Sequence, residues 1–173
     1  MKVFLIGYMG SGKSTIGKEL ATVLGFSFLD LDDYIISKER ISITELFKTK
    51  GEIYFRKIET AYLKEVLNFN KDYVIALGGG TPCYSGNIDL ITKSTDSVSF
   101  YLKLALPALV KRLLPEKDSR PLISHLKTEE DLLEFIGKHL FERVHYYTKA
   151  KFTILTDNKS KQEIVEQIVI QLV

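Results

Sequence analysis

Residues 2–24 constrain the fold of this chain more than any other segment. The apolar run Lys2–Ile6 is typical of a buried strand, and apolar residues recur at helical spacing from Ile16 to Leu24. Between them Gly7–Thr15, with the sequence GYMGSGKST, fits the pattern G-x-x-x-x-G-K-[ST]. A strand, a glycine loop and a helix in this order predict a loop that wraps a polyphosphate. The alternative is a flexible glycine turn.

The residue types of this loop suit phosphate binding. Glycine lets backbone N–H groups approach a ligand and permits positive φ, and the following helix adds free N–H groups and the positive end of its dipole. We expect Lys13 to reach the β- and γ-phosphates and the Ser14 hydroxyl to ligate Mg²⁺. The whole predicted phosphate-binding set is Gly10, Ser11, Gly12, Lys13, Ser14 and Thr15.

Length and composition indicate an ordinary globular protein. The chain has 173 residues, of which 45% are hydrophobic and 27% charged, so we expect one domain spanning 1–173. A net charge of +2 is too slight to argue for nucleic acid or a membrane surface as a partner, so we expect neither. Cys83 is the only cysteine, which excludes an internal disulfide and favours the cytoplasm. The first strand begins at once, so we expect no signal peptide, and no apolar run reaches membrane-spanning length.

Strand and helix patterns alternate along the rest of the chain. This alternation predicts an α/β fold with a mainly parallel sheet. Gly25 is typical of a helix C-terminus, and Ser42, Thr128 and Ser160 of helix N-termini. The further expected strands are 26–29, 73–77, 98–102 and 152–155. The further expected helices are 34–38, 43–48, 52–67, 87–92, 107–114 and 128–146, with a last helix after Ser160 and a loop at 115–126.

Three clusters of polar or glycine residues each follow a predicted strand directly. They are the phosphate loop, Asp30–Asp33 and Gly78–Gly80. Ligands of such folds bind beyond the carboxyl ends of the strands. If the second strand stays extended, Asp30 and Asp32 share one face. Asp30 then suits a metal shell and Asp32 suits an attacking hydroxyl, whereas we expect Asp33 to cap the next helix.

Two arginines have both a structural and a functional interpretation. Arg56 and Glu59 lie at i, i+3 and could form a surface ion pair, or Glu59 could orient Arg56 toward a ligand carboxylate. Arg143 could serve as a charge at a helix C-terminus or as a ligand-binding group. Gly78–Gly80 could be a loose turn, or could let a ring-shaped substrate approach the backbone.

The segment that carries Arg112, Lys117 and Arg120 is basic and contains prolines. It is either a solvated loop or a lid that supplies an arginine to a transferring phosphoryl group. His125, His139 and His145 show no metal-ligand spacing with one another or with Cys83.

Together these residues resemble the shikimate kinase family, within the nucleoside-monophosphate-kinase-like group, over nearly the whole chain. The phosphate loop is shared by many enzymes, whereas F-R-x-x-E followed by three glycines is more specific. The matching pieces are Gly7–Thr15, Phe28–Asp32, Gly51-Glu52, Phe55–Glu59, Leu77–Gly80, Arg120–Leu122, and Arg143 with Tyr147.

The resemblance implies a three-layer α/β/α P-loop kinase with a five-stranded parallel sheet. It implies a lid near 113–126 and a helical substrate-binding subregion near 32–62. It further implies a cytoplasmic monomer that uses ATP and Mg²⁺ to phosphorylate the 3-hydroxyl of shikimate, in the biosynthesis of chorismate and the aromatic amino acids.

The resemblance also implies roles for single residues. Asp32 would hold the shikimate hydroxyls and orient or deprotonate the attacking one. Arg56 and Arg143 would hold the ring carboxylate, and Gly79 would contact shikimate through its backbone. Arg120 would reach the phosphates from the lid. Arg112 would stack on adenine, and Lys159 would border the base.

The chain departs from the family pattern at two places. His145 stands where the family commonly has proline, and the segment from Leu113 to Ser119 is slightly longer than the pattern. Two rival functions stay open. A gluconate kinase would share Lys13, Ser14 and the lid without the acceptor set, and a non-catalytic nucleotide-binding module would have no need for Asp32.

Overall fold

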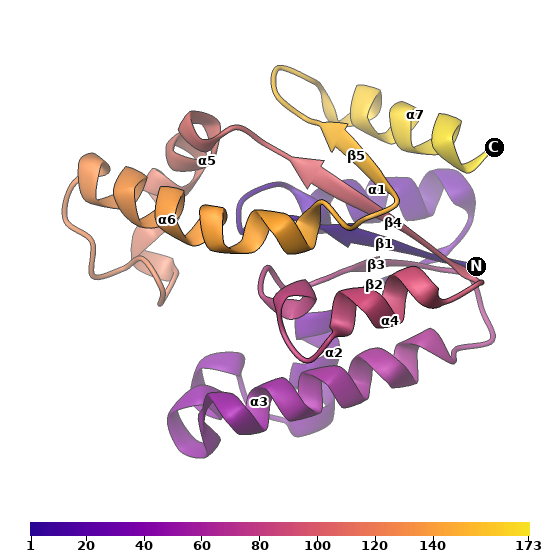
Figure 1. Ribbon diagram of the computed structural model, residues 1–173, viewed down its shortest axis with the longest axis horizontal. Helices are drawn as coiled ribbons and strands as arrows, with labels where there is room; N and C mark the ends of the chain where they lie inside the picture. The colour runs from indigo at the N-terminus through magenta and orange to yellow at the C-terminus, as the bar shows by residue number, and fades with distance from the viewer.

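The computed structural model describes residues 1–173 and is built on one parallel sheet of five strands in the order β2-β3-β1-β4-β5 (Figure 1). The strands are β1 (Lys2–Ile6), β2 (Ser27–Asp30), β3 (Tyr73–Ala76), β4 (Ser97–Lys103) and β5 (Phe152–Leu155). Every neighbouring pair is parallel, as the alternation of strands and helices predicts.

Seven α-helices and two short 3₁₀ helices connect and cover the strands. The α-helices are α1 (Lys13–Leu24), α2 (Leu31–Glu39), α3 (Ile43–Leu67), α4 (Asn87–Lys93), α5 (Leu106–Leu113), α6 (Glu129–Tyr147) and α7 (Lys161–Leu172). The 3₁₀ helices are Thr81–Cys83 and Leu114–Ser119. None of these helices combines the length and hydrophobicity that crossing a membrane requires.

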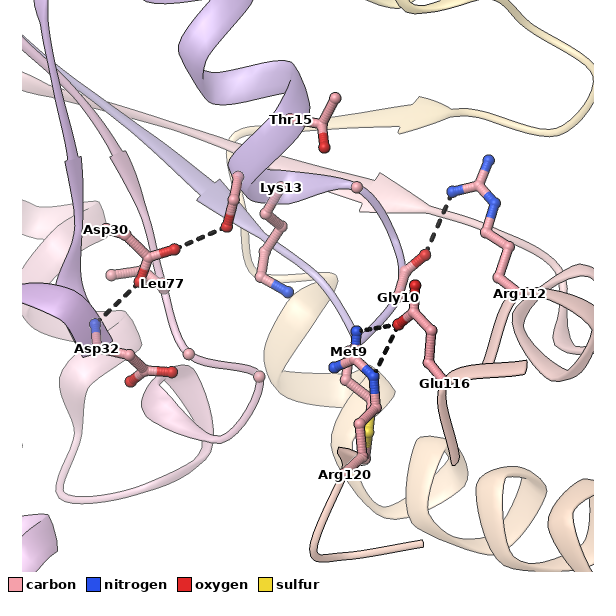
Figure 2. A pocket seen from close by; sticks show the side chains of 14 residues that line it. Met9, Gly10, Lys13, Thr15, Asp30, Asp32, Leu77, Arg112, Glu116 and Arg120 are labelled. Atoms are coloured by element: carbon pink, nitrogen blue, oxygen red, sulfur yellow. Dashed lines mark hydrogen bonds and ion pairs between the residues drawn. The ribbon is translucent and has the colours of Figure 1, made fainter. Parts of the chain in front are cut away.

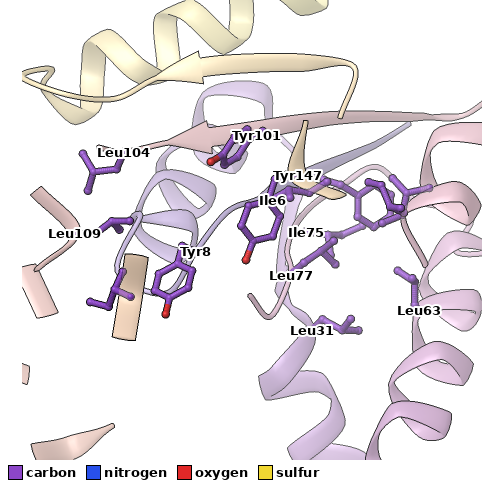
Figure 3. Close-up of a cluster of buried hydrophobic side chains, with 14 of the residues drawn as sticks. Ile6, Tyr8, Leu31, Leu63, Ile75, Leu77, Tyr101, Leu104, Leu109 and Tyr147 are labelled. Carbon is purple, nitrogen blue, oxygen red and sulfur yellow. The ribbon is translucent and has the colours of Figure 1, made fainter. Parts of the chain in front are cut away.

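The central strand β1 divides the core into two parts. All five of its residues are buried, and successive side chains of a strand point to opposite faces. Val3 and Leu5 join the cluster under α1 and α7, while Phe4 and Ile6 join the larger cluster that α2 to α6 cover (Figures 1 and 3). The sheet therefore lies between two helical layers, which confirms the three-layer architecture.

The carboxyl ends of three neighbouring strands lie level with one another. Asp30 pairs with Ala76 in the register of β2 and β3, and Leu5 pairs with Ala76 in the register of β1 and β3. The phosphate loop, the Asp30 turn and Gly78–Gly80 therefore leave the sheet side by side. The strand order also reverses between β1 and β3, where ligands of open α/β sheets bind.

The helix boundaries confirm several sequence expectations. Gly25 has φ 68° and ends α1, with its N–H directed to the carbonyls of Ala21 and Thr22. Thr128 and Ser160 begin α6 and α7 with complete capping boxes. His145, in the position of the family's proline, leaves α6 helical as far as Tyr147.

The expected break at Gly51 is confirmed, because Gly51 is non-helical at φ 81° and ψ 170° and kinks α3 into two helical segments. Two other expectations about local structure are wrong. Helix α2 begins at Leu31 and its N-cap is Asp30, so Asp33 lies in the first turn and is not the cap. The expected loop 115–126 is partly helical, because Leu114–Ser119 forms a 3₁₀ helix.

Candidate active site

Two cavities adjoin at the carboxyl end of the sheet. One has a volume of about 460 Å³ and is lined mainly by the phosphate loop, Asp30 and Arg112 (Figure 2). The other has a volume of about 340 Å³ and is lined mainly by residues of α3, Gly80 and Arg143. The residues that line both cavities are Met9, Asp32, Gly78, Gly79 and Arg120.

The phosphate loop has the backbone that its glycines predict. Gly10 and Gly12 have φ values of 78° and 96°, a region that side chains with a Cβ disfavour. The Lys13 ammonium donates to the carbonyl oxygens of Gly7 at 2.9 Å and Tyr8 at 3.0 Å. Burial lowers the pKa of Lys13 to about 8, although the carboxylates of Asp32 and Asp30 oppose this shift. The ammonium therefore lies inside the loop, close to both carboxylates.

Asp30 connects the phosphate loop to the start of α2. Its Oδ2 accepts a hydrogen bond from the Ser14 hydroxyl at 2.7 Å, and its Oδ1 accepts one from the Asp32 N–H at 3.0 Å (Figure 2). The predicted shared strand face of Asp30 and Asp32 is wrong, because the chain turns into α2 between them. Both carboxylates nevertheless line the first cavity, since the helix turn brings Asp32 back beside the sheet end.

The Asp32 carboxylate lies against Gly78 and receives no hydrogen bond from a protein group. A Cβ built on Gly78 would come within 2.9 Å of Asp32 Oδ1, so only glycine leaves this space. Burial, together with the nearby carboxylates of Asp30 and Glu59, raises the pKa of Asp32 to about 6, against the opposing effect of Lys13 and Arg56. A carboxylate that is half-buried and unpaired at a cavity wall can accept a ligand proton or hydroxyl.

Arg56 is fixed by a buried acid and an aromatic ring. Its Nη1 donates to Glu59 Oε2 at 2.9 Å, and its guanidinium lies 3.9 Å from the centre of the Tyr84 ring. Glu59 is 1% exposed, so the pair is not a surface ion pair. A Cβ on Gly80 would lie 2.8 Å from Arg56 Nη2, so a larger residue at this position would displace the guanidinium.

A buried polar network behind Arg56 was not expected from the sequence. Thr81 Oγ1 donates to Glu59 Oε1 at 2.6 Å, and Asn87 Nδ2 donates to the Thr81 carbonyl at 3.0 Å. The Thr60 hydroxyl lies 2.9 Å from Asn87 Oδ1. Both oxygens of Glu59 are thus occupied. Threonine and asparagine are also ordinary turn and cap residues, so no sequence pattern singles them out.

Helix α6 contacts both the phosphate loop and the triple glycine along one face. His139 Nδ1 lies 2.9 Å from the Tyr8 hydroxyl, and Arg143 Nη1 lies 3.3 Å from the position that a Gly79 Cβ would take. Tyr147 donates from its hydroxyl to the Gly79 carbonyl at 2.6 Å. Residues four apart share a helix face, so one side of α6 spans both halves of the site.

The basic segment after α5 also reaches the first cavity. Arg120 donates from Nε and Nη2 to Glu116 Oε2 at 3.0 and 2.6 Å (Figure 2). Arg112 donates to the Gly10 carbonyl at 3.2 Å. Lys159 does not line the cavity and donates instead to Gln167 Oε1 at 3.0 Å. The candidate site residues therefore all line one or both cavities, except Lys159 and Ser11, which is buried within the phosphate loop.

Comparisons with known proteins identify the family of the chain. The sequence model of the shikimate kinase family matches residues 9–173. The chain belongs to the shikimate kinase family. A curated shikimate kinase from Flavobacterium johnsoniae is 45% identical over 167 residues, which cover 96% of each chain. Members of this family are small-molecule kinases, so the chain is one too.

Solved structures of the shikimate kinase family have the same fold. A shikimate kinase from Bacteroides thetaiotaomicron is 33% identical, with a TM-score of 0.90 and coverage of 99% of this chain and 98% of that one. A shikimate kinase from Acinetobacter baumannii in complex with shikimate is 29% identical, with a TM-score of 0.83 and coverage of 99% and 92%. A gluconokinase from Sinorhizobium meliloti shares the fold, with a TM-score of 0.59 at 17% identity.

Proposed function

We propose that this chain transfers the γ-phosphoryl group of ATP to the 3-hydroxyl of shikimate, giving shikimate 3-phosphate and ADP. One observation carries the proposal. The cavity lined by the phosphate loop and the cavity lined by Arg56 and Arg143 meet at Asp32. Phosphoryl transfer needs the donor and the acceptor to be bound next to each other, and two adjoining cavities support such an arrangement.

The donor half is the phosphate loop with two arginines. Lys13 exchanges its carbonyl partners in the loop for the β- and γ-phosphates, and the backbone from Gly10 to Thr15 surrounds them. Arg120, from the segment 113–126 that we propose as a lid, stabilises charge on the transferring group. Arg112, beside Gly10 and Gly12, lies where it can stack on the adenine. Lys159 borders the base only if its loop moves, because it now bonds to Gln167.

The residues around Ser14 fit a Mg²⁺ ion. The Ser14 hydroxyl and the Asp30 carboxylate lie 2.7 Å apart at the cavity wall, and both are oxygen donors of the kind that Mg²⁺ prefers. Two protein ligands suffice, because Mg²⁺ in kinase sites keeps waters and phosphate oxygens as its other ligands. When bound, the ion neutralises negative charge on the phosphates.

The acceptor half lies between α3, α6 and Gly78–Gly80. Arg56 and Arg143 both line the cavity, beside Gly80 and Gly79, and hold the carboxylate of shikimate, while Gly79 offers its backbone to the ring. Asp32 accepts the proton of the attacking hydroxyl. With a pKa of about 6, Asp32 is ionised at neutral pH and still basic enough for that role. We assign the acceptor-binding helices to the subregion 32–62.

The proposed setting is a monomer in the cytoplasm. A net charge of +2 offers little attraction to nucleic acid or membrane surfaces, and an unpaired cysteine at position 83 suits a reducing compartment.

The test is a coupled assay with shikimate, gluconate and nucleoside monophosphates as acceptors, with and without EDTA. We expect phosphorylation of shikimate and of neither other acceptor, and we expect EDTA to abolish it. Asp32→Ala should lower kcat by about 10²–10⁴ while ATP still binds, because it removes the proton acceptor and no phosphate ligand. Turnover of another acceptor under conditions where shikimate does not react would refute the proposal. Normal turnover by the Asp32 variant would remove Asp32 from the mechanism.

A further inference from the structure

The triple-glycine turn needs partners outside itself to hold one conformation. Glycine has the most backbone freedom of any residue, and Gly78–Gly80 places three glycines at the wall of the acceptor cavity. A contact between the substrate and this backbone adds most to affinity if the peptide planes of the turn are fixed before binding. Otherwise binding must also order the turn, which lowers the affinity.

Each carbonyl of the turn has a hydrogen-bond donor. The Gly78 carbonyl accepts from the Thr81 N–H at 3.1 Å, and the Gly80 carbonyl accepts from the Cys83 N–H at 2.9 Å. Both donors are local. The Gly79 carbonyl accepts instead from the Tyr147 hydroxyl at 2.6 Å, across 68 residues of sequence, with only the Cys83 thiol at 4.0 Å as a weak second contact.

The N–H groups of the same three glycines have no acceptor in the protein. The C=O and N–H of one peptide unit are coplanar and point in opposite directions. A donor on the Gly79 carbonyl therefore also fixes the direction of the Gly80 N–H. Without Tyr147, the middle peptide of the turn would be the one plane held by no strong bond.

Tyr147 is placed to hold this plane rigidly. The residue is fully buried, and the centre of its ring lies 5.3 Å from the centre of the Tyr101 ring (Figure 3). Burial raises the pKa of the Tyr147 hydroxyl, so the hydroxyl keeps the proton that it donates. Arg143 lies one turn earlier on α6, beside Gly79. The bond from Tyr147 thus holds the turn against the same face of α6 that carries Arg143.

We propose that Tyr147 is a positioning residue for the acceptor, which acts by clamping the middle peptide of the triple-glycine turn against α6. The inference rests on the proposed function, because it assumes that shikimate occupies this cavity. It assigns Tyr147 no contact with the substrate. It predicts an effect on the acceptor half and none on the phosphate loop.

Tyr147→Phe tests the clamp, and Tyr101→Phe is a matched control. Tyr101 is also buried and packs against the same ring, but its hydroxyl bonds to nothing at the site. We expect Tyr147→Phe to raise the KM for shikimate by about tenfold, since a buried carbonyl loses its donor. The KM for ATP should stay close to that of Tyr101→Phe. A rise of less than threefold in the KM for shikimate, or an equal rise in both KM values, would overturn the clamp.

An NMR measurement separates this inference from the proposed function. The Gly80 amide shares a peptide unit with the Gly79 carbonyl, so its resonance should move in Tyr147→Phe and not in Tyr101→Phe, with no ligand present. In the wild-type protein the Tyr147 hydroxyl proton should exchange slowly with water. An unmoved Gly80 resonance or a rapidly exchanging hydroxyl would contradict the clamp, whichever acceptor the enzyme uses. Failure of the wild type to phosphorylate shikimate would refute only the function.

Discussion

The Asp32 carboxylate accepts no hydrogen bond from the protein. It lies near the carboxylates of Asp30 and Glu59 and lines both cavities. Its raised pKa means that the folded state disfavours its charge. The residue is therefore suited to accept a proton or a hydroxyl group and is costly for the stability of the empty enzyme. Both consequences can be measured.

We predict that Asp32→Asn stabilises the protein at neutral pH. The pKa of Asp32 is about 6 when folded and near 3.8 when unfolded, so above pH 6 the carboxylate is charged in both states and penalised only in the folded one. The gain should be on the order of 1–2 kcal/mol after solvent screening, and it should shrink as the pH falls from 6 to 4. Thermal unfolding at several pH values measures it. A melting temperature at pH 7.5 no higher than that of the wild type would contradict this prediction.

The same pKa predicts an acid limb in the activity profile. A general base works only when deprotonated, so kcat/KM for shikimate should fall about tenfold per pH unit below pH 6. Nucleotide binding, measured separately over the same range, controls for protonation of the phosphates. An activity that stays constant down to pH 4.5 would show that Asp32 does not act as the base.

The lid segment is held by a contact that competes with the nucleotide. Arg120 makes two hydrogen bonds to a single oxygen of Glu116, four residues earlier, and both side chains are partly exposed. A phosphate group would need the same guanidinium N–H groups. The 3₁₀ helix Leu114–Ser119 thus supplies an internal anion for the arginine.

We predict that Glu116→Gln lowers the KM for ATP. Exposed ion pairs contribute about 0.2–1 kcal/mol, so the expected decrease is about 1.5- to 5-fold. Lys138→Gln is a suitable control, because it breaks another exposed i, i+4 pair, with Glu134, far from the cavity. An increased KM for ATP in the Glu116 variant would mean that Glu116 orients Arg120 and does not compete for it.

Local patterns predict elements well where one signal dominates. The backbone of the phosphate loop and the caps at Gly25, Thr128 and Ser160 depend mainly on neighbouring residues, and each is confirmed. The parallel sheet follows from the alternation of strands and helices along the chain and is confirmed too. The capping role of Asp30 was missed because strand alternation and a cap compete at the same residue.

Contacts between distant segments leave little trace in one sequence. The Thr81–Asn87 network and the bond from Tyr147 to Gly79 join residues whose types suit many other settings. The family pattern contains Tyr147 without indicating what its hydroxyl binds. Placing Arg56 and Arg143 around one cavity likewise required the resemblance to a family, since each arginine alone is equally consistent with a surface charge.

At the scale of the whole molecule, the two cavities predict separable ligand responses. Ligand at about 100 times its Kd stabilises a protein by about 2.7 kcal/mol, which raises the melting temperature of a chain of this size by roughly 5–10 °C. Lys13→Ala should abolish the increase caused by ATP and keep that caused by shikimate. Arg143→Ala should do the reverse. If either variant loses both responses, the cavities are not independent binding sites.

The two halves of the site are carried by different elements of the fold, and this has an evolutionary consequence. The phosphate loop follows β1, whereas Arg56 and Arg143 are carried by α3 and α6. Mutations at the cavity-facing positions of α3 and α6 can therefore exchange the acceptor while the phosphate loop and the contact of His139 with Tyr8 are kept. A lineage could acquire a new substrate by altering α3 and α6 while the older phosphate site stays under unchanged selection.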